Sequence, residues 1–177
     1  GQNWTNVGGI HVDQHALYAH PMESNFVVIG NDGGVYTSES GTQANTFLTN
    51  LPITQFYTCE VNYQNPLQRY GGTQDNGTNR TLTGGSSDWS RIYGGDGFIV
   101  RVNPVDGQHV YAASQRGGFG RSTNGGSSFQ GGKSGITGSN RYNWKTPYIL
   151  DPTDPKIMYL GSQKVYKSTN HAASWTA

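Results

Sequence analysis

The sequence is short of charge, of cysteine and of long apolar runs, and each shortage excludes a class of protein. Charged residues make up 13% of the 177 residues, against a usual share of about 25%, which excludes a highly charged disordered chain. No segment approaches the ~20 consecutive apolar residues of a membrane-spanning helix, so no membrane span is predicted. The single cysteine, Cys59, excludes an internal disulfide framework, and its apolar neighbours predict a buried, inert thiol in a strand.

Basic residues give no sign of a nucleic-acid surface. The 12 lysines and arginines are scattered along the chain and the formal net charge is +1. Because there is no basic stripe, nucleic acid is not an expected partner. The start of the sequence shows no signal peptide, and we interpret it as a mature or trimmed end.

Glycine and aromatic residues are abundant. The chain has 26 Gly, 11 Tyr, 6 Phe and 4 Trp, whereas a helical bundle would be dominated by Ala, Leu, Glu and Lys. Glycine-rich turns between aromatic and β-branched segments are typical of many short strands. The sequence therefore predicts an all-β fold.

The sequence repeats at a nearly constant interval. Aromatic residues that close polar, glycine-rich turns are spaced 43, 42, 40 and 46 residues apart: Trp4, Phe47, Trp89, Phe129 and Trp175. Small residues that end apolar runs are spaced 42, 41 and 48 residues apart: Gly30, Gly72, Ala113 and Gly161. A period of ~40–50 residues with four short strands per unit is what a β-propeller blade requires.

These intervals predict one propeller region over residues 1–177, with an N-terminal strand around Trp4 left from a preceding repeat. Its four repeats are predicted at 5–47, 48–89, 90–129 and 130–175. Strands of the second repeat are predicted at 56–63, 69–73, 78–82 and 89–93. Because one small sheet cannot bury both of its faces, neighbouring repeats are expected to stack, with the turn aromatics in the core between them.

Two segments carry a resemblance to a known motif. Residues 122–129 read Ser-Thr-Asn-Gly-Gly-Ser-Ser-Phe, and residues 168–175 read Ser-Thr-Asn-His-Ala-Ala-Ser-Trp. They resemble the Asp-box, the S-x-D-x-G-x-x-W turn of bacterial neuraminidase repeats, with Asn in place of Asp in both. The motif is structural, because a short polar side chain caps backbone N–H groups in the turn while the ring packs inward. It does not imply sialidase activity.

The chain also resembles sortilin-like repeat propellers of secreted bacterial proteins. The resemblance rests on stretches distributed over nearly the whole chain: 11–17, 30–36, 51–57, 71–77 and 94–98. It implies four-stranded blades with Asp-box turns and an extracellular or cell-surface location. A more distant similarity is to the xyloglucanase propellers of glycoside hydrolase family 74, which implies a catalytic carboxylate in the loop that holds Asp32.

Polar side chains recur in the loops that a propeller would bring to one face. One follows each small anchor residue by two positions: Asp32, Gln74, Gln115 and Gln163. The predicted ligand-binding residues of this face are Gln74, Asn76, Asp96, Gln115, Arg116, Arg141, Trp144 and Gln163. Amides, a carboxylate and an exposed ring together suit a sugar, through hydrogen bonds to hydroxyls and a stacking platform.

Each of these residues also has a structural interpretation. Asp32, Asp75 and Asp96 stand in ordinary turn sequences. The three glutamines would instead bond backbone groups between blades. Trp144 would be a core aromatic, and Arg116 a solvated side chain.

If the protein is an enzyme, the best-supported chemistry is glycoside hydrolysis by two carboxylates. The predicted catalytic pair is Asp32 and Asp75, with Asp96 or Asp13 as the alternative partner. An inverting pair needs carboxyl groups ~6.5–9.5 Å apart, and in the xyloglucanases the partner carboxylate lies on a second propeller. No cofactor is predicted.

A metal site is not predicted, although one spacing of His and Asp residues is compatible with metal ligands. The pattern His11-x-Asp13-x-His15 would put three ligand types on one face of a strand, with adjacent side chains ~7 Å apart, and would suit zinc or manganese. A hydrogen-bonded packing cluster is the favoured interpretation.

The sequence thus predicts a secreted or cell-surface β-propeller module that binds carbohydrate or a protein partner through its loop face. Alternatives are a segment of a xyloglucanase-like hydrolase and a structural part of a larger exported protein. Four repeats are few for a closed ring, so the rest of a larger propeller, or a second copy of the chain, is an expected partner.

Overall fold

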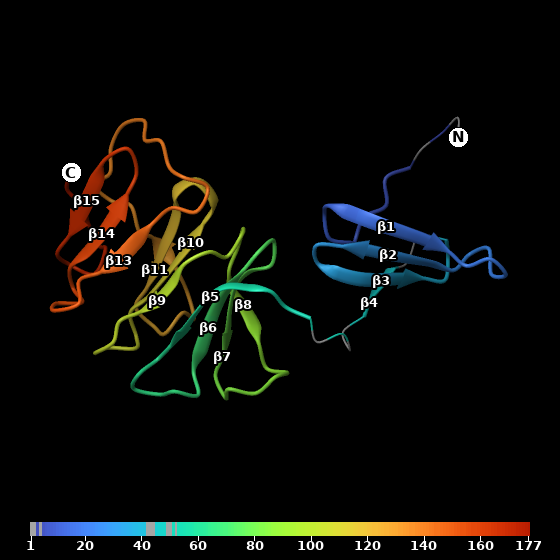
Figure 1. Ribbon diagram of the computed structural model, residues 1–177, viewed down its shortest axis with the longest axis horizontal. Coiled ribbons are helices and arrows are strands. Elements are labelled where there is room, and N and C mark those ends of the chain that lie inside the picture. The colour runs from blue at the N-terminus through green and yellow to red at the C-terminus, as the bar shows by residue number, and fades with distance from the viewer. Residues whose placement is uncertain (1–2, 4, 42–44, 49–50, 52) are drawn as a thin grey trace. The chain divides into compact units, whose positions relative to one another are not determined.

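The computed structural model describes residues 3, 5–41, 45–48, 51 and 53–177. Trp4, and with it the predicted strand of a preceding repeat, lies outside the described residues. The chain divides into two compact units, which we call the N-terminal unit (Gly1–Thr54) and the C-terminal unit (Gln55–Ala177) (Figure 1).

The N-terminal unit contains one antiparallel sheet, the first sheet, with its strands in chain order. These strands are β1 (Gln14–Ala19), β2 (Val27–Asn31), β3 (Gly34–Ser38) and β4 (Asn45–Phe47). Side chains of the central strand alternate between buried and partly buried, so that Val27 and Ile29 form its small core. The aromatic residue at its end, Phe47, packs on Tyr36 with ring centroids 5.0 Å apart.

The C-terminal unit contains three antiparallel sheets that follow one another from green to red in Figure 1. The second sheet has β5 (Phe56–Val61), β6 (Arg69–Thr73), β7 (Gly77–Thr81) and β8 (Ser90–Tyr93). The third has β9 (Val100–Val102), β10 (Val110–Ser114), β11 (Gly118–Ser122) and β12 (Gln130–Gly131). The fourth has β13 (Tyr148–Leu150), β14 (Met158–Gly161) and β15 (Val165–Ser168), to which Thr176 adds a single bridge with Lys167.

The predicted fold class is confirmed. Among the described residues the only helical segment is the three-residue turn Gln115–Gly117, and no helix there has the length and apolar character needed to cross a lipid bilayer. The predicted strand at 69–73 is observed at these residues, whereas the strand predicted at 56–63 ends at Val61. It ends because the Asn62 side chain accepts the backbone N–H of Gln64 (3.0 Å) and turns the chain.

Successive sheets of the C-terminal unit share their cores. The larger core lies between the third and fourth sheets and includes Tyr111, Phe119, Tyr148 and Trp175, all of them buried. The Tyr148 hydroxyl donates to the carbonyl oxygens of Tyr111 (2.8 Å) and of Ile99 (2.9 Å), which ties the fourth sheet to the third. The sheets therefore stack in the way the repeat predicts.

The second and third sheets stack in the same way. Tyr70 of β6 joins Val100, Val102 and Val110 of the third sheet in a smaller core, against which Phe129 packs. The backbones approach closely at Gly72, where a Cβ atom would lie 2.1 Å from the carbonyl oxygen of Phe98. Only glycine fits at this position, because any side chain would push the sheets apart.

Two of the turn aromatics have the predicted place between sheets. Phe129 packs on Tyr93 of the second sheet (5.0 Å between centroids), and Trp175 packs on Phe119 of the third (5.8 Å). Trp89, by contrast, packs on Phe56 of its own sheet (5.3 Å).

The turns that precede these two residues have the same hydrogen bonds. The Ser122 hydroxyl accepts the N–H groups of Asn124 (3.2 Å) and Gly126 (2.9 Å), and Asn124 Oδ1 accepts that of Ser128 (2.9 Å). Ser168 and Asn170 form the same set with the residues of the second turn. A short polar side chain thus caps each turn, as the motif predicts.

In the corresponding turn of the second sheet, the capping residue is Asp88, which lies at the C-terminal end of the turn and binds residues at its start. The Thr81 hydroxyl donates to Asp88 Oδ1 (2.6 Å), and the N–H groups of Leu82 and Thr83 donate to Oδ2 (3.2 Å each). The hydrogen bond from Thr81, followed by those from Thr83 and Leu82, lowers the pKa of Asp88 to about 2.

The predicted burial of Cys59 is wrong. The residue does lie in a strand, β5, but its side chain is exposed. β5 is an edge strand whose Thr58 side faces the third sheet, where its hydroxyl donates to the Phe98 carbonyl oxygen. Within the C-terminal unit Cys59 therefore has no sheet to pack against.

A stacked pair of histidines joins the third and fourth sheets near the outer turns. The rings of His109 and His171 lie 4.0 Å apart with an interplanar angle of 18°. His109 Nδ1 lies 2.9 Å from Asp106 Oδ2, and His171 Nδ1 lies 3.4 Å from the Tyr111 hydroxyl. Burial lowers the pKa of His171, and the nearby charges of His109 and Lys156 lower it further against the opposing effect of Asp106 and Asp154.

We expect the stability of the protein to fall as the pH drops from about 7 to 5. Because the pKa of His171 is lower in the folded state, the unfolded chain binds more protons below its own pKa of ~6.5, which favours unfolding. His171→Asn, a residue that tolerates the φ of 56° found here, should flatten this dependence. Urea midpoints at several pH values test this.

Lys156→Gln should give an intermediate dependence, since it removes one of the charges that lower the pKa of His171. An equal loss of stability in the wild-type protein and in His171→Asn would contradict the assignment.

Candidate functional site

The four recurring polar residues all lie in the turn between the second and third strands of their sheets. Asp32 and Gln74 contact the first strand of the same sheet, and Gln115 and Gln163 contact the loop that leads into it. The four contacts are Asp32 Oδ1 with His15 Nε2, Gln74 Oε1 with the Tyr57 hydroxyl (2.7 Å), Gln115 Oε1 with the Asp96 N–H (3.0 Å), and Gln163 Oε1 with the Arg141 N–H (2.6 Å). This position is therefore a brace for the loops around it in every repeat.

The brace partly supports the structural interpretation of the glutamines. Gln163 also donates through Nε2 to the Ser139 carbonyl oxygen (3.3 Å) and to Asn140 Oδ1 (3.4 Å), so its amide is fully used. The amide oxygen of Gln115 is used as well. The backbone N–H groups that donate to Gln115 and Gln163, however, belong to the loop that enters the same sheet and not to a second blade.

In the N-terminal unit, the predicted spacing of His11, Asp13 and His15 along one strand face does not hold. β1 begins only at Gln14, and Asp13 has a φ of 58°, which breaks the alternation of side chains. His15 instead contacts Asp32, and the His11 ring lies against Gly33, where a Cβ atom would be 2.6 Å from Cγ of the ring.

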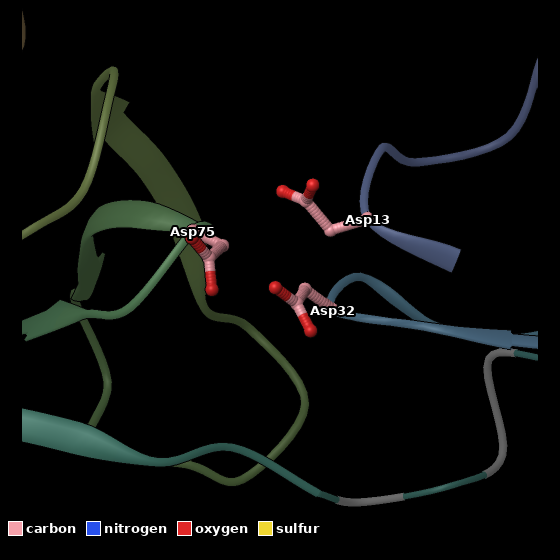
Figure 2. Close-up of side chains that lie close together, drawn as sticks. All are labelled: Asp13, Asp32 and Asp75. Atoms are coloured by element: carbon pink, nitrogen blue, oxygen red, sulfur yellow. The ribbon is translucent and has the colours of Figure 1, made fainter. Parts of the chain in front are cut away.

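Asp13 and Asp32 nevertheless lie close together. Their carboxylate oxygens are within 4.8 Å of one another, and Figure 2 shows both side chains at the same end of the first sheet. Asp75, also drawn there, belongs to the C-terminal unit. Neither unit by itself contains the predicted pair Asp32 and Asp75, and two carboxylates alone do not complete a metal site.

The turn that holds Gln74, Asp75 and Asn76 has a tight backbone. Asp75 adopts a φ of 58°, and the Asn76 N–H and side-chain amide both donate to the Gln74 carbonyl oxygen (2.6 and 3.2 Å). Asn79 in turn donates to the Asn76 carbonyl oxygen (3.2 Å). These contacts are those of turn-forming residues.

Asp96 is a buried residue in the loop between β8 and β9. The residue is 7% exposed, and its backbone is fixed by Gln115 and by the neighbouring bond from the Gly97 N–H to the Thr73 carbonyl oxygen (2.8 Å). In the described part of the chain, no hydrogen bond or ion pair reaches its carboxylate. These oxygens are not among the buried atoms that lack a partner, so they are open to solvent and are accessible to a ligand hydroxyl.

Trp144 is an exposed ring with two neighbours, and it is not a core aromatic. It is 47% exposed, and its ring meets that of Phe98 edge-on at 6.0 Å. The Arg116 guanidinium carbon lies 5.4 Å from the centroid of the Trp144 ring. The Arg116 N–H also donates to the Trp144 carbonyl oxygen (3.0 Å), which fixes the two residues to one another.

The structure adds two residues that the sequence analysis did not select. Tyr57 is 41% exposed, and its ring packs on the ring of Phe98, with the two centroids 5.3 Å apart. Lys145 Nζ lies 5.8 Å from the centroid of the Tyr57 ring. The only signals for them are that Lys145 follows Trp144 and that Tyr57 ends the matched stretch 51–57.

Arg141 and Gln163 line an open depression on the fourth sheet. It has a volume of about 440 Å³ and is lined by Arg141, Tyr142, Asn143, Pro147, Gly161, Ser162 and Gln163. Trp144, Asp96 and Arg116 are not part of this lining, so the predicted ligand-binding residues do not gather in one pocket.

Comparison with known proteins bears on the fold. The sequence matches no family model and no curated protein. An ancestral GH74 enzyme is similar in structure, with a TM-score of 0.59 and 23% identity over 97% of this chain and 25% of that one. So are the Niastella koreensis GH74 enzyme (TM-score 0.56, 15% identity, 95% and 25%) and the Xanthomonas campestris GH74 xyloglucanase (0.52, 19%, 93% and 25%).

The four sheets are β-propeller blades. At these identities the likeness shows the fold alone, because one fold serves many functions. The chain spans about a quarter of the length of the enzymes it matches.

Gln115→Leu should loosen the loop that carries Asp96. The variant removes the acceptor of the Asp96 N–H, and the loss of one hydrogen bond of about 1 kcal/mol should speed exchange of this amide roughly fivefold. Amide hydrogen exchange measured by NMR tests this, with Gln108→Leu as the control, since Gln108 is an exposed glutamine in the β9–β10 turn. Unchanged exchange at Asp96 in Gln115→Leu would contradict the brace.

Proposed function

We propose that this chain is a β-propeller module of a secreted or cell-surface protein and that it binds carbohydrate through the loops of its C-terminal unit. The observation that carries the proposal is the exposed Trp144 ring, fixed by Phe98 and Arg116. A ring of this kind offers the apolar face of a sugar a place to stack, while neighbouring polar groups select its hydroxyls.

Polar residues of the neighbouring turns support this choice of ligand. Asp96 offers carboxylate oxygens that are accessible to a hydroxyl, and Gln115, which holds the Asp96 backbone, is followed by Arg116 in the same turn. Gln74 braces Tyr57, the second exposed ring, through its amide oxygen. A protein partner that presents hydroxyl and amide groups is the alternative occupant of this face.

The repeats at 5–47, 48–89, 90–129 and 130–175 are proposed as the blades of an Asp-box propeller. The shared hydrogen bonds of the Ser122 and Ser168 turns support the motif. Exposed apolar side chains on the outer strands, such as Ile149 (55% exposed) and Val165 (68%), support further blades or a second copy of the chain as a neighbour.

Glycoside hydrolysis is the second candidate function, with Asp32 as the catalytic carboxylate. The likeness of fold to GH74 enzymes favours it only by analogy. The contact of Asp32 with His15 and the closeness of Asp13 place polar groups around this carboxylate within the N-terminal unit.

Trp144→Ala should abolish oligosaccharide binding, because it removes the stacking surface. A glycan array followed by calorimetry on the best ligand measures this, with Tyr63→Ala as the control, since Tyr63 is an exposed tyrosine (66%) in the β5–β6 turn. Unchanged binding by Trp144→Ala would count against the proposed site.

If the protein is a hydrolase, Asp32→Asn should remove hydrolysis of β-glucans, measured as release of reducing ends. Equal activity in the wild-type protein and in Asp32→Asn would refute the assignment of Asp32. A wild-type protein that binds glucans without cleaving them would favour the binding module over the enzyme.

A further inference from the structure

Arg116 is an exposed residue whose backbone and guanidinium group both contact Trp144. It lies in the β10–β11 turn with a φ of 52°, and its backbone N–H is bonded to Trp144. Its guanidinium carbon lies 5.4 Å from the centroid of the Trp144 ring. Among the residues that the structure describes, no carboxylate forms an ion pair with it.

This arrangement leaves the binding capacity of the guanidinium unused. A guanidinium stacked on a ring keeps its N–H donors free in its own plane, where they match the two oxygens of a carboxylate. Because the backbone and the stacking already restrict Arg116, little further freedom is lost when a ligand binds.

Lys145 repeats this pattern beside Arg116. It follows Trp144 in the sequence, and its Nζ lies 5.8 Å from the centroid of the Tyr57 ring. It too has no ion pair within the described part of the chain. The rings of Tyr57 and Trp144 both pack on Phe98, so Arg116 and Lys145 lie over neighbouring rings of one surface.

We propose that this surface, formed by Tyr57, Arg116, Trp144 and Lys145, binds an acidic oligosaccharide and that the carboxylate of a uronic acid residue pairs with Arg116. The inference rests on the proposed function and names the class of its ligand. A sugar fits better than an acidic peptide because the exposed rings suit sugar faces.

The test compares trigalacturonate with its fully methyl-esterified, neutral form by calorimetry on the complete chain. At low salt the wild-type protein should bind trigalacturonate at least about tenfold more tightly than the methyl ester, as expected for one charge-assisted hydrogen-bonded pair. Raising the salt concentration should reduce the preference. Arg116→Gln should bring the two affinities together while it leaves binding of the neutral form intact.

Two further variants keep the result interpretable. Lys145→Gln lies outside the strained turn and should lower the preference for the acid even if Arg116→Gln folds poorly. Lys167→Gln is the matched control, because Lys167 also stands over a ring, that of Tyr159 at 5.8 Å, but on strand β15. It removes the same charge and should leave the preference unchanged.

Each outcome decides between the proposals. Equal affinity of the wild-type protein for both forms, or an unchanged ratio in Arg116→Gln, would overturn the acidic ligand and leave carbohydrate binding standing. Failure to bind any oligosaccharide would overturn the proposed function itself. Binding of a hexaglutamate peptide that depends on Arg116, without binding of sugars, would assign the carboxylate to a protein partner and overturn the inference.

Discussion

The fold of the C-terminal unit depends on the stacking of one small sheet on the next. A four-stranded sheet has two faces and cannot bury both by itself, so its stability comes from the core that it shares with a neighbour. The Tyr148 hydroxyl and the Trp175 indole N–H, which donates to the Gly132 carbonyl oxygen (2.6 Å), add directed bonds to this apolar contact. Between the second and third sheets, the absence of a side chain at Gly72 permits the close approach of the two backbones.

The candidate site is a consequence of this stacking. Successive sheets repeat the same order of strands, and in each sheet the turn between the second and third strands is braced to the chain at or just before the first strand. The brace is constant while its chemistry varies, since a carboxylate takes the position in the first sheet and an amide takes it in the other three. A repeated scaffold can therefore hold neighbouring residues such as Arg116 that need not repeat.

The sequence predicted the fold better than the site. Period and turn residues predicted the strands of the second sheet closely, because both are local properties of the chain. The face of an edge strand is decided by what stacks on it, which explains the error at Cys59. Hydropathy also gave no sign that Arg116 lies over the Trp144 ring or that Lys145 lies over the Tyr57 ring, since each contact joins segments that are far apart in the sequence.

The capped turns of the second sheet and of the third and fourth sheets respond differently to acidic conditions. The turns of the third and fourth sheets are capped by serine hydroxyls and by the amides of Asn124 and Asn170, none of which gains a proton in the acid range. The second sheet relies on the Asp88 carboxylate, whose cap is lost once the pH falls through about 2. A turn capped by asparagine and serine thus keeps a geometry that is independent of the acidity of its surroundings.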